Sequence, residues 1–320
     1  MTLTRPRAVV PASGFPRFLA GRLVWLLAAV VVVVSATFVL IYVIPADPVS
    51  AVLGGRIQAD QIEAIKARYG FDLPIWQQYL RFWGGLFRGD LGFSFATQQD
   101  VGQAIAARAG ATAALAVAGL LLSLLIGVGT GVFAALMRGT WKDRAAMGTV
   151  VLGMGVPPFL MGLVLVFVFA YLLPVFPVSG YGSAAHLVLP ALTIGLTGGA
   201  YYARLLRGRL VEVMDADFVR ASRSRGMRES AVFVRHTLRN SFLPVLTWMG
   251  MDLGYFLSGV IAVEAIFAWP GIGTLAYRAI TDYDTPMIVG TVLVSAVAIV
   301  TVNLIIDLVY PLLDPRMAHR

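Results

Sequence analysis

Long apolar stretches constrain this sequence more than any other feature. Residues 23–44 contain no charged side chain, and further apolar stretches follow between residues 112 and 310. A helix needs about 20 mostly apolar residues to cross the hydrocarbon core of a bilayer. A cleaved signal peptide has an apolar region of only about 7–15 residues, so we interpret residues 23–44 as a retained transmembrane helix. The sequence therefore predicts an all-α membrane protein.

The apolar pattern predicts six transmembrane helices. Their expected ranges are 23–44, 112–137, 145–173, 187–203, 242–263 and 287–310. Pro157-Pro158 should kink the third, because paired prolines remove two backbone donors. The remaining chain divides into an N-terminal arm (1–22), an extracytoplasmic segment (45–111), a polar loop (211–241) inside the core region 112–310, and a tail (311–320).

Composition and charge place both ends of the chain in the cytoplasm. Only 13% of the residues are charged, whereas soluble domains have about 25%. The net charge of +8 does not indicate nucleic acid, because cytoplasmic loops of membrane proteins are enriched in Lys and Arg. Most of the 25 basic residues fall in the arm, the tail and the loops at 138–144 and 204–239.

The sequence offers little for catalysis or metal binding. It has no Cys, and its three His are scattered along the chain, so a metal site is not expected. Neither Lys66 nor Lys142 belongs to a GK[ST] motif, so a phosphate-binding P-loop is absent. HExxH and GxSxG are also absent, which argues against a membrane enzyme. We expect no cofactor in this chain.

The polar loop 211–241 is unusually long and basic for a connection between two spans. Asp215 or Asp217 as an N-cap and Gly226 as a C-terminal cap predict a short helix over 216–225. A second helix is expected over 228–240. Charge alone favours an ordinary cytoplasmic loop, whose arginines contact anionic lipid and orient the protein in the membrane.

The residue pattern of this loop resembles a known family. Its motifs are Arg220-Ala221-Ser222-x-x-x-Gly226 and Arg235-His236-x-x-Arg239-Asn240-x-x-x-Pro244. They resemble the EAA loop of ABC-importer permeases, and in detail the dipeptide/oligopeptide/nickel branch, in the subunit usually encoded first. Arg220 stands where the generic loop has Glu, although Arg is usual in the peptide branch. Ser222 and Ser224 replace the commoner Ala.

Further motifs extend the resemblance from about residue 17 to 316. Each is weak alone, but their order and spacing match the family over nearly the whole chain. They are Pro45-Ala46-Asp47-Pro48, Leu73-Pro74-x-x-x-Gln78-Tyr79, Gly89-Asp90-Leu91-Gly92-x-Ser94, Glu264-x-x-Phe267-x-x-Pro270-Gly271-x-Gly273, Asp284-Thr285-Pro286 and Asn303-Leu304-x-x-Asp307-x-x-Tyr310-x-x-x-Asp314-Pro315-Arg316.

The resemblance implies the type I ABC-importer permease architecture and half of a translocation path in a bacterial or archaeal plasma membrane. The implied partners are membrane lipid, a second homologous permease, two ATPase subunits (or one ATPase as a homodimer) that bind ATP and Mg, and an extracytoplasmic substrate-binding protein that delivers a peptide. The implied ATPase-coupling residues are Asp217, Phe218, Arg220, Ala221, Ser222, Arg225 and Gly226. Nickel or another small solute is an alternative cargo, and a stand-alone secondary transporter or channel is an alternative class.

Four polar residues fall within or beside the predicted spans, where they are costly unless they face protein or water. Asp252 and Glu264 are candidates for lining the path, where a carboxylate could meet the amino group of a peptide. Glu264 has a structural alternative, as a cap for the external loop. Asn303 and Asp307 lie one helical turn apart, and we interpret them as structural residues that bond a neighbouring helix.

Overall fold

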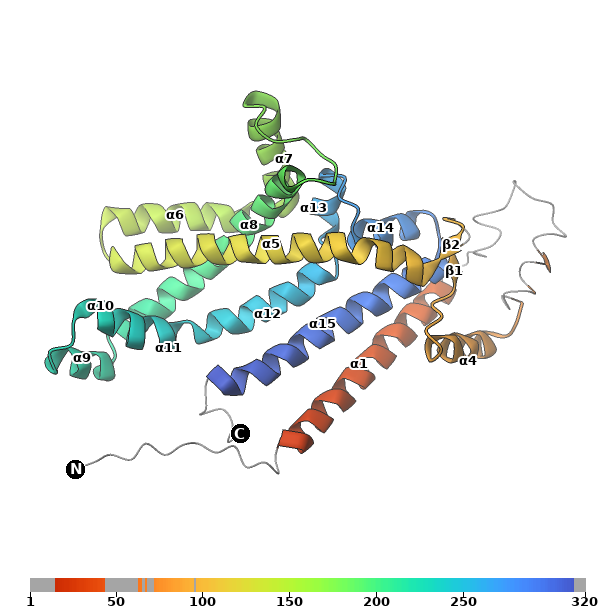
Figure 1. The fold of residues 1–320 in the computed structure, drawn as a ribbon, viewed down its shortest axis with the longest axis horizontal. Helices are drawn as coiled ribbons and strands as arrows, with labels where there is room; N and C mark the ends of the chain where they lie inside the picture. Colours follow the sequence, from red (N-terminus) through yellow and green to blue (C-terminus); the bar gives the residue numbers. More distant parts are fainter. Residues whose placement is uncertain (1–14, 44–62, 65–66, 68–71, 95, 314–320) are drawn as a thin grey trace.

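The structure is a computed structural model that describes residues 15–43, 63–64, 67, 72–94 and 96–313 (Figure 1). The Pro45–Pro48 motif, most of the extracytoplasmic segment before residue 72 and the two chain ends lie outside the described residues. The described part is mostly helical. In Figure 1, the short helices of residues 217–241 lie at one end of the molecule, and the β-hairpin lies at the opposite end.

Two long helices, α5 (Val101–Leu136) and α8 (Ala184–Met214), form the centre of the molecule. They run in the same direction, since Gly119 of α5 faces Ile194 of α8 and Gly131 faces Leu206 further along. α5 begins at Val101, before the expected start at residue 112. α8 continues past residue 203, where the apolar pattern stops, and includes the first residues assigned to the polar loop.

Small residues let these two backbones approach each other. A Cβ added at Gly127 would overlap the Tyr202 side chain and lie 2.8 Å from the carbonyl oxygen of Gly199. One added at Gly198 would lie 2.6 Å from Ser123 Oγ, which itself donates to the carbonyl oxygen of Ile194 at 3.2 Å. Glycine contacts of this kind are typical of tightly packed transmembrane helices, where lipid supplies no hydrophobic drive for association.

The predicted kink at the proline pair is a sharp break. α6 (Trp141–Gly155) ends before Pro157, and a new helix, α7 (Pro158–Val166), starts at Pro158 and continues as the π-helix η1 (Phe167–Leu172). The two parts are bent by 105°. α7 therefore projects from the body of the molecule, as Figure 1 shows.

After α8 the chain forms several short helices and one long helix, α15. They are α9 (Asp217–Ser224), α10 (Glu229–Val232), the π-helix η2 (Phe233–Leu238), α11 (Arg239–Ser241), α12 (Leu243–Leu257), α13 (Ile261–Ile266), α14 (Ile272–Thr281) and α15 (Thr285–Leu313). The predicted helix over 242–263 is thus interrupted after Leu257. Gly259 has φ +98°, and a Cβ there would lie 2.5 Å from the Gly273 backbone, so this close contact breaks the helix.

The N-terminal elements cover the last helix. α1 (Phe15–Val43) packs along α15, and α4 (Ile75–Leu86) packs on α1 through Tyr79, whose hydroxyl lies 2.6 Å from Ser35 Oγ. The strands β1 (Phe93–Ser94) and β2 (Gln99–Asp100) pair antiparallel before α5.

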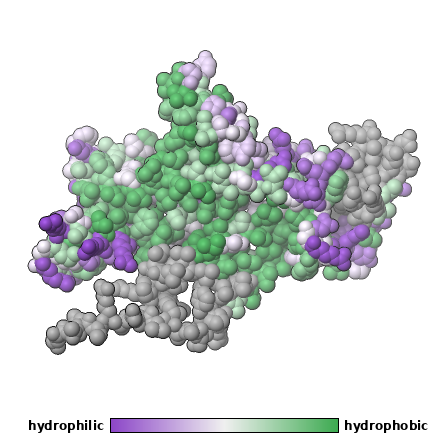
Figure 2. All heavy atoms as spheres, in the orientation of Figure 1, coloured by the Kyte–Doolittle hydropathy of each residue, from purple (hydrophilic) through white to green (hydrophobic). Residues whose placement is uncertain are grey.

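Among the described residues, α5, α8 and residues 285–306 of α15 are long and apolar enough to cross a membrane, and the bent pair of α6 with α7 and η1 could form a fourth crossing. α12 has 15 residues, and the apolar part of α1, Val24–Val39, is also shorter than these helices. In Figure 2 an apolar band covers the middle of the molecule, and hydrophilic surface gathers at both ends.

The close contact at Gly127 predicts a large effect from one methyl group. We expect Gly127→Ala to lower the free energy of unfolding of the purified chain in detergent by about 1–3 kcal/mol, because the methyl would overlap the α8 backbone. Gly129→Ala is the matched control on the same helix, since a Cβ there meets nothing within 4 Å. Equal stability of the two variants in denaturant unfolding would contradict this account of the packing.

Candidate functional site

The short helix α9 occupies the polar end of the molecule, close to its predicted position (Figure 1). The predicted acidic N-cap is wrong. The N-cap is Ala216, whose side chain cannot accept a hydrogen bond, and Asp217 is the first helical residue. Asp217 still favours the helix start, because its negative charge lies at the positive end of the helix dipole.

α9 has an inner and an outer face. Val219 and Ser222 are buried, and Ser222 Oγ donates to the carbonyl oxygen of Phe218 at 2.7 Å. The Asp217 side chain is 99% exposed, and Phe218 is 45% exposed. The predicted coupling residues thus separate: Ser222 lies on the buried inner face, whereas the outer face combines a carboxylate with an aromatic ring.

The end of α9 follows the predicted pattern. Gly226 has φ +77°, the left-handed conformation in which Gly carries no steric cost, and its N–H donates to the carbonyl oxygen of Arg223 at 2.9 Å. Arg225 Nε donates to the carbonyl oxygen of Ala221, and Arg220 NH2 donates to that of Asp215. These arginines therefore fasten the two ends of α9, in addition to supplying positive charge.

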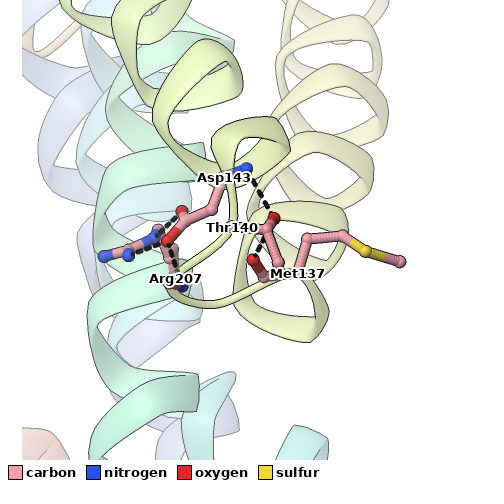
Figure 3. A network of polar contacts seen from close by, with 5 residues as sticks. Met137, Thr140, Asp143 and Arg207 are labelled. Atoms are coloured by element: carbon pink, nitrogen blue, oxygen red, sulfur yellow. Dashed lines mark hydrogen bonds and ion pairs between the residues drawn. The ribbon is translucent and has the colours of Figure 1, made fainter.

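A buried ion pair supports the helix that leads to α9. Arg207 of α8 forms two hydrogen bonds with Asp143 in the first turn of α6, of 2.7 Å from Nε and 2.6 Å from NH2 (Figure 3). The Asp143 side chain is only 4% exposed. Arg138, in the turn between α5 and α6, bonds Asp215 at 2.7 Å. Sequence reasoning missed this arrangement, because its partners are 64 and 77 residues apart.

A groove opens where α6 breaks at the prolines. It consists of two adjoining hollows of about 400 and 560 Å³, which share Met154, Tyr201, Trp248 and Asp252. The buried Tyr202 donates its hydroxyl proton to Asp252 Oδ2 at 2.7 Å. Of the two predicted path residues, Asp252 therefore lies in a groove.

Glu264, the other predicted path residue, is fully buried. Its carboxylate accepts hydrogen bonds from Thr274 N at 2.7 Å, Thr274 Oγ1 at 3.0 Å and Thr112 Oγ1 at 3.4 Å. These bonds join α13, the start of α14 and α5. The arrangement supports the structural alternative, in which Glu264 holds the loop between α13 and α14.

Asn303 lies on the exposed side of α15. Asp307 belongs to the same helix, but its side chain lies outside the described residues. Their predicted bond to a neighbouring helix stays a prediction.

At the opposite end of the molecule, the structure joins two motifs that lie far apart in the sequence. Ser94 of β1 donates a 2.5 Å hydrogen bond to Asp284 Oδ2, although 190 residues separate them. Both side chains are buried. Burial raises the pKa of the Asp284 carboxyl above its usual range, and the Ser94 bond opposes this effect. The bond fastens the β-hairpin to the start of α15.

Comparison with protein families matches most of the chain. Residues 127–319 match the binding-protein-dependent transport system inner membrane component, and residues 15–116 match its N-terminal companion domain. The first match contains α8, the groove and α9. The second range includes residues 44–62, so it extends beyond the part that the structure describes.

Relatives of known name agree with this match. The chain is 32% identical over 303 residues to the glutathione transport system permease protein GsiC of Escherichia coli O6:H1, covering 95% of this chain and 99% of the relative. It is 33% identical over 299 residues to GsiC of Pectobacterium atrosepticum, covering 93% and 98%.

A solved structure supports the fold. An inward-facing structure of the MetNI methionine ABC transporter aligns with a TM-score of 0.55 and 17% identity, over 66% of this chain and 96% of that chain. The fold, the family match and the relatives thus agree. The chain belongs to the binding-protein-dependent transport system inner membrane components, and it is a permease subunit of a bacterial ABC importer.

Proposed function

We propose that this permease forms half of the translocation path of an importer for peptides, and that α9 receives the force of ATP hydrolysis. The GsiC relatives, whose name assigns them to glutathione transport, support a peptide-type cargo. Nickel or another small solute remains the alternative cargo. We further propose six membrane crossings with both chain ends in the cytoplasm, which extends the helices counted above by α1 and α12.

The proposed complex contains this chain, a second homologous permease, two ATPase subunits and an extracytoplasmic substrate-binding protein. The ATPases supply the ATP and Mg sites. The family match supports a binding protein and ATPases as partners, since its members are components of binding-protein-dependent systems. A stand-alone transporter or channel would instead move solute without any ATPase.

The outer face of α9 is the observation that carries the coupling proposal. Phe218 is a half-exposed aromatic ring beside an exposed carboxylate, on a helix whose inner face is buried. Aromatic residues at the centre of an interface often dominate binding energy. Arg220 of α9 donates to the carbonyl oxygen of Asp215, whose side chain pairs with Arg138 in the turn after α5. The Asp143–Arg207 pair joins α6 to α8, so force on α9 reaches the transmembrane core.

Phe218→Ala tests the docking surface. We expect it to weaken co-purification of the ATPase subunits by tenfold or more, because truncating an aromatic hot spot costs roughly 2 kcal/mol or more. Val234→Ala is the matched control, since Val234 is 58% exposed and lies outside α9. ATPase yield that is equal in the two variants would contradict docking on Phe218.

Gly226→Asp tests the coupling step. We expect it to abolish ATP-dependent peptide uptake into proteoliposomes, because it places a negative charge at the carboxyl end of α9. Gly226→Asn is the control: Asn has the same shape and also tolerates the left-handed conformation, but it is neutral. Normal uptake by Gly226→Asp would count heavily against the coupling role of this end of α9.

The Asp143–Arg207 pair should act as a unit. We expect Asp143→Asn and Arg207→Gln each to reduce uptake and stability, because each leaves one partner of a largely buried pair without its counterpart. In the double variant the loss of stability should be smaller than the sum of the single losses by about 0.5–3 kcal/mol. Strictly additive losses in thermal unfolding would show that the pair contributes no coupling.

A further inference from the structure

The carboxylate of Asp252 has a fixed position at the surface of the groove. It lies on α12, and the Tyr202 hydroxyl of α8 binds its Oδ2 atom. Tyr202 is 1% exposed, and its Cβ is packed against Gly127 of α5, so the hydroxyl has little freedom to turn away. The central helix pair thus holds one oxygen of this carboxylate in place.

No cation within the described residues forms an ion pair with Asp252. Arg204 and Arg209 line the hollow of about 400 Å³, but the ion pair of Arg209 is with Glu212, at 2.8 Å. Membrane-embedded carboxylates are costly, and they usually face a cation or a water-filled cavity. Because Asp252 lines both hollows, its carboxylate is open to a positively charged group from outside the described fold.

The side chains around Asp252 favour one type of cation. Tyr201, Trp248 and Tyr255 line the groove with it, and each of these rings is about half exposed. Aromatic faces attract ammonium groups, and a carboxylate beside them adds a charge-assisted hydrogen bond. The larger hollow, of about 560 Å³, lies in the size range of small-molecule sites.

We propose that Asp252, positioned by Tyr202 and surrounded by Tyr201, Trp248 and Tyr255, is a subsite for the α-ammonium group of the transported peptide. This inference rests on the proposed function, because it assigns a contact to a ligand already inside the path. It adds that the permease itself recognises a charged amino terminus. The subsite lies beside the break at Pro157-Pro158, since both prolines line the larger hollow with Asp252.

The test is peptide binding to the assembled complex in nanodiscs without the substrate-binding protein. The probes are L-alanyl-L-alanine and N-acetyl-L-alanyl-L-alanine, which differ in the ammonium group and carry no charged side chain. Saturation-transfer NMR titrations give both dissociation constants, including millimolar ones. We expect the free dipeptide to bind the wild-type complex at least tenfold more tightly than the acetylated one.

The variants locate this selectivity. Asp252→Asn keeps the shape of the side chain and an oxygen for Tyr202, and should reduce the selectivity to about twofold or less. Asp282→Asn removes a carboxylate from an exposed position at the end of α14 and should leave the selectivity unchanged. Tyr202→Phe keeps the Asp252 charge but frees its oxygen, and should reduce the selectivity only in part.

Three outcomes overturn the inference. They are equal binding of the two dipeptides to the wild-type complex, unchanged selectivity in Asp252→Asn, and loss of the second permease from the purified Asp252→Asn complex. The last would make Asp252 a partner in an ion pair between subunits. Failure of the wild-type chain to co-purify with ATPases would instead count against the proposed function.

Discussion

The close contact between α5 and α8 is the constraint on which the rest of the structure depends. Two helices in lipid gain little from burying apolar side chains, so their association relies on backbone proximity and dispersion. Gly127 and Gly198 provide that proximity, and larger side chains at either position would push the helices apart. The same contact holds Tyr202, and through it the carboxylate of Asp252, in a defined place. The contact that packs α5 against α8 therefore also positions Asp252, the candidate ligand contact.

The second organising feature is the break after α6. Residues 153–158, at the end of α6 and the break, line the larger hollow together with residues of α8 and α12. The chain bends by 105° at Pro157 and Pro158. The aromatic residues of the groove, Tyr201, Trp248 and Tyr255, are about half exposed. α6 also contributes Asp143 near its start. The bond from Asp143 to Arg207 holds the part of α8 that leads to α9. One short helix therefore borders the groove at its carboxyl end and supports the approach to α9 at its amino end.

Much of this arrangement could be predicted from the sequence, because it depends on local signals. Apolar runs predict the long helices, the proline pair predicts the break, and Gly226 predicts the end of α9. Two errors have physical causes. α8 extends to Met214 because the arginines after residue 203 are compatible with a helix and one of them pairs with Asp143, although they end the apolar run. α12 stops at Leu257 because Gly259 meets Gly273, a contact between segments that the sequence pattern does not connect.

The pairs Tyr202–Asp252, Arg207–Asp143 and Ser94–Asp284 are the part that sequence reasoning could not reach. Each joins residues from different helices or strands, separated by 50 to 190 positions. Nothing in the local pattern identifies the partner of a polar residue at such a separation. Asp252 itself was noticeable, since a lone acid in an apolar stretch is costly. Its partner becomes apparent only when α8 and α12 are placed together.

The length of α8 has a mechanical consequence. One uninterrupted helix of 31 residues carries Tyr201 and Tyr202 in its middle and ends three residues before α9 begins. At 1.5 Å per residue it is about 46 Å long, so a tilt of roughly 10° about its centre moves each end by about 4 Å. The centre of such a rod turns while its ends are displaced. A modest push at the end of α8 beside α9 would therefore rotate the two tyrosines within the groove and shift the other end of α8 in the opposite direction, without any change in secondary structure.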